Sequence, residues 1–139
     1  ENRFTLPGLV TENMVEQIGQ MDISLMTTTT ESLPNAIIAA QLAGRPVIAP
    51  DVGGVSEALA APDMGRLLHR TPDLSRDALA DALAATVIEA LDDETWRETV
   101  WREAPKLSHA RFSTAVCLSA LKQVYGWPEH SAMTPPPPA

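Results

Sequence analysis

The residue best suited to chemistry is Glu31, a single carboxylate between a short apolar run and the start of a longer one. Pro34 follows it, and an almost purely apolar stretch follows the proline, which predicts that a helix begins there. The turn Asp-Val-Gly-Gly at 51–54 stands in the same position after the next apolar run. In parallel α/β sheets, ligands bind beyond the carboxyl ends of the strands, at loops that lead into helices. We therefore expect Glu31 and the 51–54 turn at one edge of such a sheet, facing a shared cleft.

The elements that must position these residues alternate along the chain, as in a parallel α/β fold. The predicted fold is a Rossmann-like parallel sheet of about four strands with helices on both faces. The strands are expected near 3–6, 22–27, 46–49 and 65–68. The helix after Glu31 should span 33–43 and be buried because it is apolar nearly all round, with Gly44 as its C-terminal cap.

The last third of the chain is predicted to be helical, with helices near 74–91, 93–104 and 114–125. Asp92 or Asp93 can cap the second of these helices, and Ser113 can cap the third. Pro105 should end or kink the second helix. Residues 127–139 include four consecutive prolines and are predicted to form a flexible tail, so the predicted domain is 1–126.

The composition limits the class of protein. A chain of 139 residues with 45% hydrophobic residues suits one globular domain or part of one. A net charge of −8 argues against a nucleic-acid partner, because phosphate backbones need a positive surface. The single cysteine and the spacing of the histidines predict no disulfide, metal site or cofactor. No apolar run is long enough to span a membrane and the first residues lack a signal pattern, so we expect a cytoplasmic location.

A known family shares the central block of the sequence. The block begins Glu-Ser-Leu-Pro-Asn, continues into an apolar helix and Gly-Arg-Pro-Val-Ile-Ala, and closes with Asp-Val-Gly-Gly. It resembles the C-terminal donor-binding domain of family 4 retaining glycosyltransferases, which have the GT-B fold. The flanking stretches FTLPGLV, MDISLMTTTTES, GRLLHRTPDLSRDALADAL and ARFSTAVCLSALKQVYG are similar to the neighbouring parts of that domain. The resemblance covers roughly residues 3–126.

The resemblance implies transfer of a hexose from a nucleotide-sugar donor to a glycan or lipid acceptor, in glycan or glycolipid synthesis. Glu31 would be the acid of the catalytic site and accept hydrogen bonds from hydroxyls of the donor hexose. Amides at the helix start would face the sugar and the distal phosphate, because a helix N-terminus favours anions. The residues that the resemblance assigns to donor binding are Ser32, Leu33, Pro34, Asn35, Gly8, Leu9, Gly53 and Gly54.

One position departs from the family pattern. The family has a second glutamate, which binds the ribose hydroxyls, at the position that Ala39 occupies here. Gln41, two residues further on, would project about 200° away around the helix. Losing a charged hydrogen bond is worth ~1.5–3 kcal/mol, or about one to two decades in affinity. We therefore expect weak donor binding without loss of the fold.

The resemblance also indicates parts of the family's proteins that have no counterpart in this chain. Two further strand–helix units with a basic diphosphate-binding patch, and a whole acceptor-binding domain, are not found in this sequence. We therefore expect the chain not to catalyse transfer alone, and to need an N-terminal region or self-association to cover an open sheet edge. Any peripheral contact with the inner face of a membrane would come through the missing domain.

A second interpretation, from another class, remains open beside the enzyme. The chain would then be a degenerate, non-catalytic α/β module kept for binding or assembly, which Ala39 favours. The other side chains with chemical potential have plainer predicted roles. His69 is expected to be structural and Arg45 to be a surface charge, and packing is the predicted role of Trp96, Trp101 and Trp127.

Overall fold

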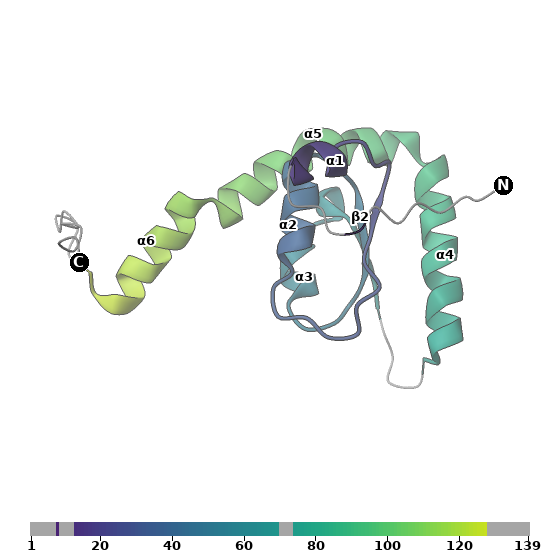
Figure 1. Cartoon of the computed structure of the whole chain (residues 1–139), viewed down its shortest axis with the longest axis horizontal. Coiled ribbons are helices and arrows are strands. Elements are labelled where there is room, and N and C mark those ends of the chain that lie inside the picture. The colour runs from purple at the N-terminus through teal and green to yellow at the C-terminus, as the bar shows by residue number, and fades with distance from the viewer. Residues whose placement is uncertain (1–7, 9–12, 70–73, 128–139) are drawn as a thin grey trace.

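Three short parallel strands form the centre of the molecule, in the spatial order β1 (Ser24–Leu25), β2 (Val47–Pro50) and β3 (Arg66–Leu68). The computed structural model describes residues 8, 13–69 and 74–127. Ser24 pairs with Val47 in the first ladder, and Ile48 pairs with Arg66 in the second. Helices flank this sheet (Figure 1), so the predicted α/β fold class is confirmed.

The four helices predicted from the sequence occur in the expected order, together with three shorter helical segments in the described part of the chain. They are α1 (Met14–Ile18), α2 (Asn35–Leu42), α3 (Val55–Ala58), the 3₁₀ turn η1 (Pro62–Met64), α4 (Arg76–Asp92), α5 (Glu94–Phe112) and α6 (Thr114–Tyr125). Among the helices that the structure describes, no segment combines the length and the apolar character that a membrane span requires.

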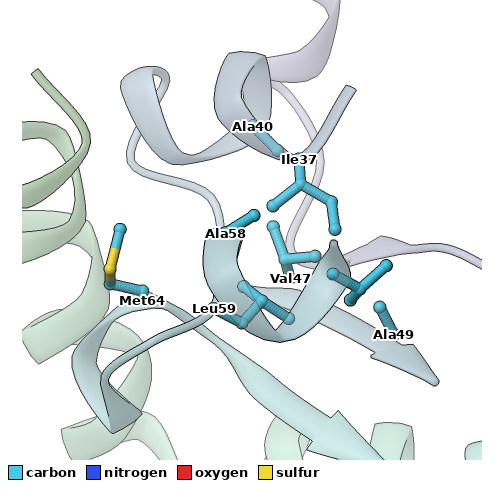
Figure 2. Close-up of a cluster of buried hydrophobic side chains, with 8 residues drawn as sticks. Ile37, Ala40, Val47, Ala49, Ala58, Leu59 and Met64 are labelled. Carbon is cyan, nitrogen blue, oxygen red and sulfur yellow. The ribbon is translucent and has the colours of Figure 1, made fainter. Parts of the chain in front are cut away.

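Alternating side chains of β2 divide the core between the two faces of the sheet. Val47 and Ala49 pack on one face with α2, α3 and η1 (Figure 2). Ile48 faces the other side and packs against Leu79 and Leu83 of α4. The strand is buried along its whole length, as expected for a central parallel strand. Helices therefore cover both faces, as predicted.

The C-terminus of α2 closes on a glycine, which confirms the prediction for Gly44. Its N–H donates to the carbonyl of Gln41 at 2.9 Å, and the N–H of Arg45 donates to the carbonyl of Ala40 at 2.8 Å. This is the Schellman pattern, and Gly44 has the required positive φ of 68°. A Cβ at Gly44 would lie 2.9 Å from Cδ1 and 3.0 Å from the carbonyl oxygen of Trp101, so α5 packs directly on this turn.

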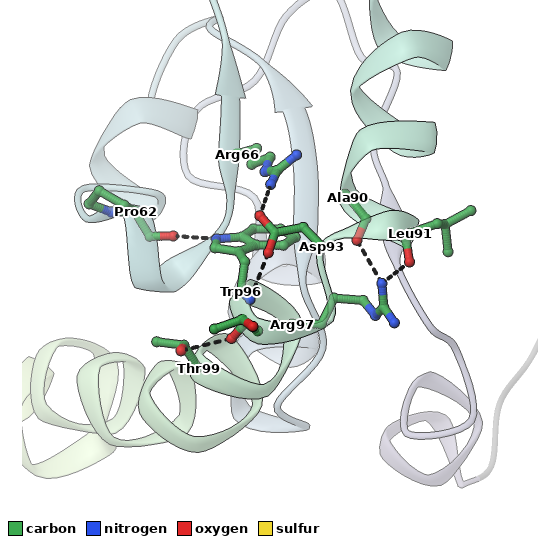
Figure 3. Close-up of polar contacts among 9 residues, drawn as sticks. Pro62, Arg66, Ala90, Leu91, Asp93, Trp96, Arg97 and Thr99 are labelled. Atoms are coloured by element: carbon green, nitrogen blue, oxygen red, sulfur yellow. Dashed lines mark hydrogen bonds and ion pairs between the residues drawn. The ribbon is translucent and has the colours of Figure 1, made fainter.

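Asp93 joins α4 to α5 and confirms the predicted cap. Its Oδ1 accepts the N–H of Trp96 at 3.0 Å, and its Oδ2 lies 2.7 Å from Nη2 of Arg66 on β3 (Figure 3). The Arg66 guanidinium stacks 4.3 Å from the centroid of the Trp96 ring. The indole Nε1–H donates to the carbonyl of Pro62 at 3.1 Å. Sheet, η1 and α5 are thus tied together at one corner.

Pro105 lies inside α5, so the helix predicted near 93–104 does not end at the proline. The alternative, that the proline kinks the helix, stays a prediction. Proline has no N–H for the carbonyl four residues back, which belongs to Trp101, and that carbonyl lies against Gly44. The buried residues of α5 lie on both sides of the proline: Val100, Ala104 and Ser108. Burial of this stripe, in a helix that contacts α2 and η1, offsets a proline cost of about 3 kcal/mol.

Other boundaries differ from the predictions by smaller amounts. The strand predicted at 22–27 shortens to β1, although the N–H of Met26 still donates to the carbonyl of Ile48 at 2.9 Å. Helix α2 starts at Asn35, because Pro34 has an extended ψ of 110° and serves as the N-cap. The helix is buried on one side only, and Leu42 is 46% exposed. The strand predicted at 3–6 and residues 128–139 lie outside the described residues.

Candidate functional site at the carboxyl edge of the sheet

The loops that leave β1 and β2 pack backbone to backbone at the carboxyl edge of the sheet. A Cβ built on Gly53 would lie 1.7 Å from the carbonyl oxygen of Glu31. A Cβ built on Gly54 would lie 1.8 Å from the carbonyl oxygen of Ser32. Only glycine leaves room for this approach, and Gly53 also has a positive φ of 53°. The structure thus brings the loop of Glu31 and the 51–54 turn together.

The N-terminus of α2 lies immediately after Glu31. The carbonyl of Pro34 accepts the N–H groups of Ile37 at 3.1 Å and Ile38 at 3.4 Å. The amides of Asn35 and Ala36 make no hydrogen bond within the described part of the chain. Free N–H groups at a helix start, aligned with the positive end of the helix dipole, favour an anion beside them.

The predicted donor-binding residues fall into two groups. Glu31 is half-buried, Ser32, Leu33 and Asn35 are exposed, and the Pro34 side chain is buried. Proline also lacks an N–H, so the predicted row of amides has a gap at this position. Gly53 and Gly54 lie against the Glu31 loop, as described above. Of the other two predicted donor-binding residues, Gly8 has open space around its Cβ position, and Leu9 lies outside the described residues.

A histidine–aspartate pair at the same edge was not predicted. Asp51 follows β2 directly and His69 follows β3 directly, and His69 Nδ1 lies 3.1 Å from Asp51 Oδ2. The Asp51 N–H also donates to the carbonyl of Leu68 at 2.7 Å, which extends the ladder between these strands. The signal in the sequence was that each residue comes directly after one of two strands that a parallel sheet places side by side.

Position 39 carries no acid, and no neighbour on α2 replaces it. Gln41 is fully buried, and its Nε2 donates to the carbonyl of Ala58 at 2.8 Å and to that of Met64 at 3.4 Å. It therefore stabilises the contact of α2 with α3 and η1. Ala39 is half-buried, and no side chain of α2 supplies the carboxylate that the family pattern has at this position.

Three other side chains had predicted roles, and the structure describes all three. Trp96 is a packing residue, as predicted. Trp101 is 62% exposed, but its Cδ1 lies against the Gly44 turn, so this ring packs on one side only. Arg45 precedes β2 and therefore lies at the amino edge, away from Glu31. It is half-buried, and its Nε is buried without a partner among the described residues, so it is no simple surface charge. Within the described ranges, no group of three His, Cys, Asp or Glu side chains could hold a metal ion.

The family model described as glycosyl transferases group 1 matches residues 1–93, which is more than half of the chain. The chain belongs to the group 1 glycosyltransferases. The match contains the whole described sheet, the loops of Glu31 and Gly53, and α4, and it ends at the cap of α5. No curated protein matches the sequence significantly.

Proposed function

We propose that this group 1 glycosyltransferase chain is the donor-binding part of a family 4 retaining hexosyltransferase with the GT-B fold. The observation that supports this proposal is the packing of the Gly53–Gly54 backbone on the carbonyls of Glu31 and Ser32. That contact holds a half-buried carboxylate and a helix N-terminus at the carboxyl edge of a parallel sheet, where such folds bind ligands.

In this proposal Glu31 and the start of α2 have separate tasks. The carboxylate of Glu31 accepts hydrogen bonds from hydroxyls of the donor hexose. The amides of Ser32, Leu33 and Asn35 face the sugar and the distal phosphate of a nucleoside diphosphate. Negative charge grows on the leaving diphosphate as the glycosidic bond breaks. Donors that already point there stabilise the transition state more than the ground state.

The remaining parts of the proposed donor site are weaker. Gly8 and Leu9 are proposed to contact the nucleotide base of the donor. Ala39 provides no carboxylate to bind the ribose hydroxyls. We therefore expect a dissociation constant in the micromolar to millimolar range. The acceptor would be a glycan or a lipid bound by another region, so the domain 1–126 would not catalyse transfer alone. A nucleotide-sugar donor places the reaction in the cytoplasm, at the inner face of the membrane for a lipid acceptor.

One observation favours a second candidate, a non-catalytic module derived from a glycosyltransferase. Ala39 lacks the acid of the family pattern, and the nearest polar side chain, Gln41, is buried in a structural contact. Under this alternative the fold persists for binding or assembly, and nucleotide sugars do not bind at Glu31.

Isothermal titration calorimetry with several nucleotide sugars distinguishes the two. We expect millimolar or tighter binding by the chain, at least tenfold weaker binding for Glu31→Gln, and about tenfold tighter binding for Ala39→Glu. Glu16→Gln is a matched control, because Glu16 is an exposed acid on α1. Equal affinity in Glu31→Gln and the control would show that Glu31 is only a loop acid. No binding by the chain or by Ala39→Glu, even when the N-terminal strand–helix units are supplied, would favour the non-catalytic module.

A further inference from the structure

A cleft of about 220 Å³ lies at the amino edge of the sheet, away from the Glu31 loop. Asp22 precedes β1 and Arg45 precedes β2, and because the strands are parallel, both residues lie at this edge. Helix α5 runs past the end of α2 (Figure 1), and its first turns complete the cleft. The polar and aromatic side chains that line it are Asp22, Arg45, Glu94, Arg97, Glu98 and Trp101. The cleft is therefore separate from the loops proposed to bind the donor.

Trp101 forms an apolar wall of the cleft. The residue is 62% exposed, yet one edge of its ring is held in place, because Cδ1 lies only 2.9 Å from the Cβ position of Gly44. An indole offers a large contact surface and has only two side-chain torsions to fix, so binding against it costs little conformational entropy. The cleft thus contains a flat apolar surface that is already in position.

The charged side chains of the cleft do not neutralise one another. Within the described residues, no ion pair involves Asp22, Glu94, Glu98 or Arg45, and Nε of Arg45 is buried without a hydrogen-bond partner. Arg97 donates to two carbonyls at the end of α4, which holds it beside the cleft. A carboxylate only accepts hydrogen bonds and a guanidinium only donates them. The cleft therefore offers both acceptors and donors to a ligand.

We propose that this cleft binds one pyranose ring of a neutral glycan. Each hydroxyl of a sugar ring both donates and accepts, so neighbouring hydroxyls can donate to the carboxylates and accept from the guanidiniums. The C–H groups on one face of the ring would stack on the indole, whose π face is negative. A cleft of about 220 Å³ is smaller than the ~300–1,000 Å³ of sites for drug-sized ligands and suits a single ring. This inference goes beyond the proposed donor site and does not depend on it.

The balance of charge favours a neutral sugar over a charged ligand. An anion, such as a nucleotide sugar, would face three carboxylates against two guanidiniums. A basic side chain would be attracted by the carboxylates and by the indole face, but Arg45 and Arg97 line the same small space and would repel it. Hydroxyl groups carry no net charge, so both kinds of side chain can stabilise them. The chemistry of the cleft therefore selects a neutral polyhydroxyl ligand.

Titration of the isotopically labelled chain, followed by nuclear magnetic resonance, tests the proposal. The probes are the methyl pyranosides of glucose, galactose and mannose, and the backbone amide shifts of Asp22 and Arg45 report binding. We expect at least one sugar to bind with a dissociation constant of about 1–10 mM, as for a ligand of this size. Raising the salt concentration about tenfold should change this value less than twofold, because salt screens charges and the ligand has none.

Matched variants locate the site. Trp101→Ala should weaken binding at least tenfold, whereas Trp127→Ala removes another exposed indole and should leave binding unchanged. Glu98→Gln should weaken binding about fivefold, and Glu89→Gln is its control, because Glu89 is an exposed acid of α4 outside the cleft. Glu31→Gln should bind the sugars as the unaltered chain does, which separates this cleft from the proposed donor site. Circular dichroism verifies the fold of each variant, and the exposed Glu98 provides the test where Trp101→Ala impairs folding.

Three results would overturn the proposal. One is the absence of any shift with all three sugars at about 100 mM. Another is an unchanged affinity in a folded Trp101→Ala or Glu98→Gln variant. A third is tighter binding of the amide of acetylated lysine than of every sugar, lost on raising the salt concentration, which would show that the cleft takes a basic side chain of a partner.

Discussion

Gly53 and Gly54 show how a single residue type determines the geometry of the candidate site. Each glycine faces a backbone carbonyl of the Glu31 loop so closely that a Cβ atom at either position would clash with the carbonyl oxygen. The pair therefore fixes the separation of two loops that are about 20 residues apart in the sequence. Without it, Glu31 and the start of α2 would not be held at the carboxyl edge beside the 51–54 turn.

Gly53→Ala should destabilise the protein by at least about 2 kcal/mol in urea unfolding. The new Cβ would meet the Glu31 carbonyl oxygen at 1.7 Å, in addition to the cost of a left-handed alanine. Gly126→Ala separates the two causes, because Gly126 has a similar φ of 59° and nothing near its Cβ position. We expect Gly126→Ala to cost only about 1 kcal/mol. Equal losses in the two variants would contradict the packing argument.

At the scale of the elements, the corner around Asp93 connects α4, α5 and β3. One carboxylate caps α5 through the N–H of Trp96 and also pairs with Arg66. The two tasks use different oxygens of the same side chain, so substitutions can separate them. Arg97 adds donors from α5 to the carbonyls of Ala90 and Leu91 at the end of α4.

Asp93→Ala should lower the free energy of unfolding by about 1–2 kcal/mol, because it removes a cap worth about 1 kcal/mol and a partly exposed ion pair. Asp93→Asn keeps the cap and removes the charge, so its loss should stay below about 1 kcal/mol. Thermal unfolding monitored by circular dichroism measures both variants. An Asn variant as unstable as the Ala variant would show that the ion pair, and not the cap, holds the corner.

Pro105→Ala should raise the unfolding temperature. Alanine restores the N–H that the carbonyl of Trp101 lacks and removes a residue that costs about 3 kcal/mol in a helix interior. The gain should be smaller than that cost, because replacing the proline also raises the conformational entropy of the unfolded chain. Calorimetry of the variant checks the prediction. An unchanged or lower unfolding temperature would mean that α5 is built around the proline ring.

At the scale of the whole molecule, β1 is a sheet edge in the described part of the chain. One side of β1 pairs with β2, and the opposite side pairs with no strand among the described residues. Leu25 on this strand is 48% exposed. A cavity of about 530 Å³ lies between this edge and α4, lined by the following residues: Leu25, Thr27, Thr29, Arg76, Leu79, Ala80, Leu83 and Ala84. An open edge beside an apolar groove can accept a further strand.

We predict that the chain self-associates, or pairs with another chain, through this edge. Multi-angle light scattering at micromolar concentration should show a species larger than the monomer. Leu25→Lys should reduce it, because a lysine on an edge strand opposes strand addition. Leu121→Asp on α6 is the control and should leave it unchanged. A monodisperse monomer, or a dimer insensitive to Leu25→Lys, would contradict this prediction.

The sequence alone determined the order and kind of the elements, because their signals are local. Apolar runs alternating with helical patterns predicted the parallel sheet, and α6 has the predicted bounds. Side chains within three residues of a helix start predicted the caps at Asp93 and Ser113. A glycine after an apolar helix likewise predicted the turn at Gly44. Each of these depends on interactions between near neighbours in the chain.

Only the tertiary structure decided which distant residues meet. Gln41 is polar in the sequence, yet it is buried because carbonyls of α3 and η1 lie within reach of its amide. Pro105 stays in a helix because packing on both sides outweighs its local cost. The pairing of His69 with Asp51 depends on the adjacency of β2 and β3. Local sequence patterns do not predict such contacts, because these contacts form only when segments far apart in the chain pack together and exclude water.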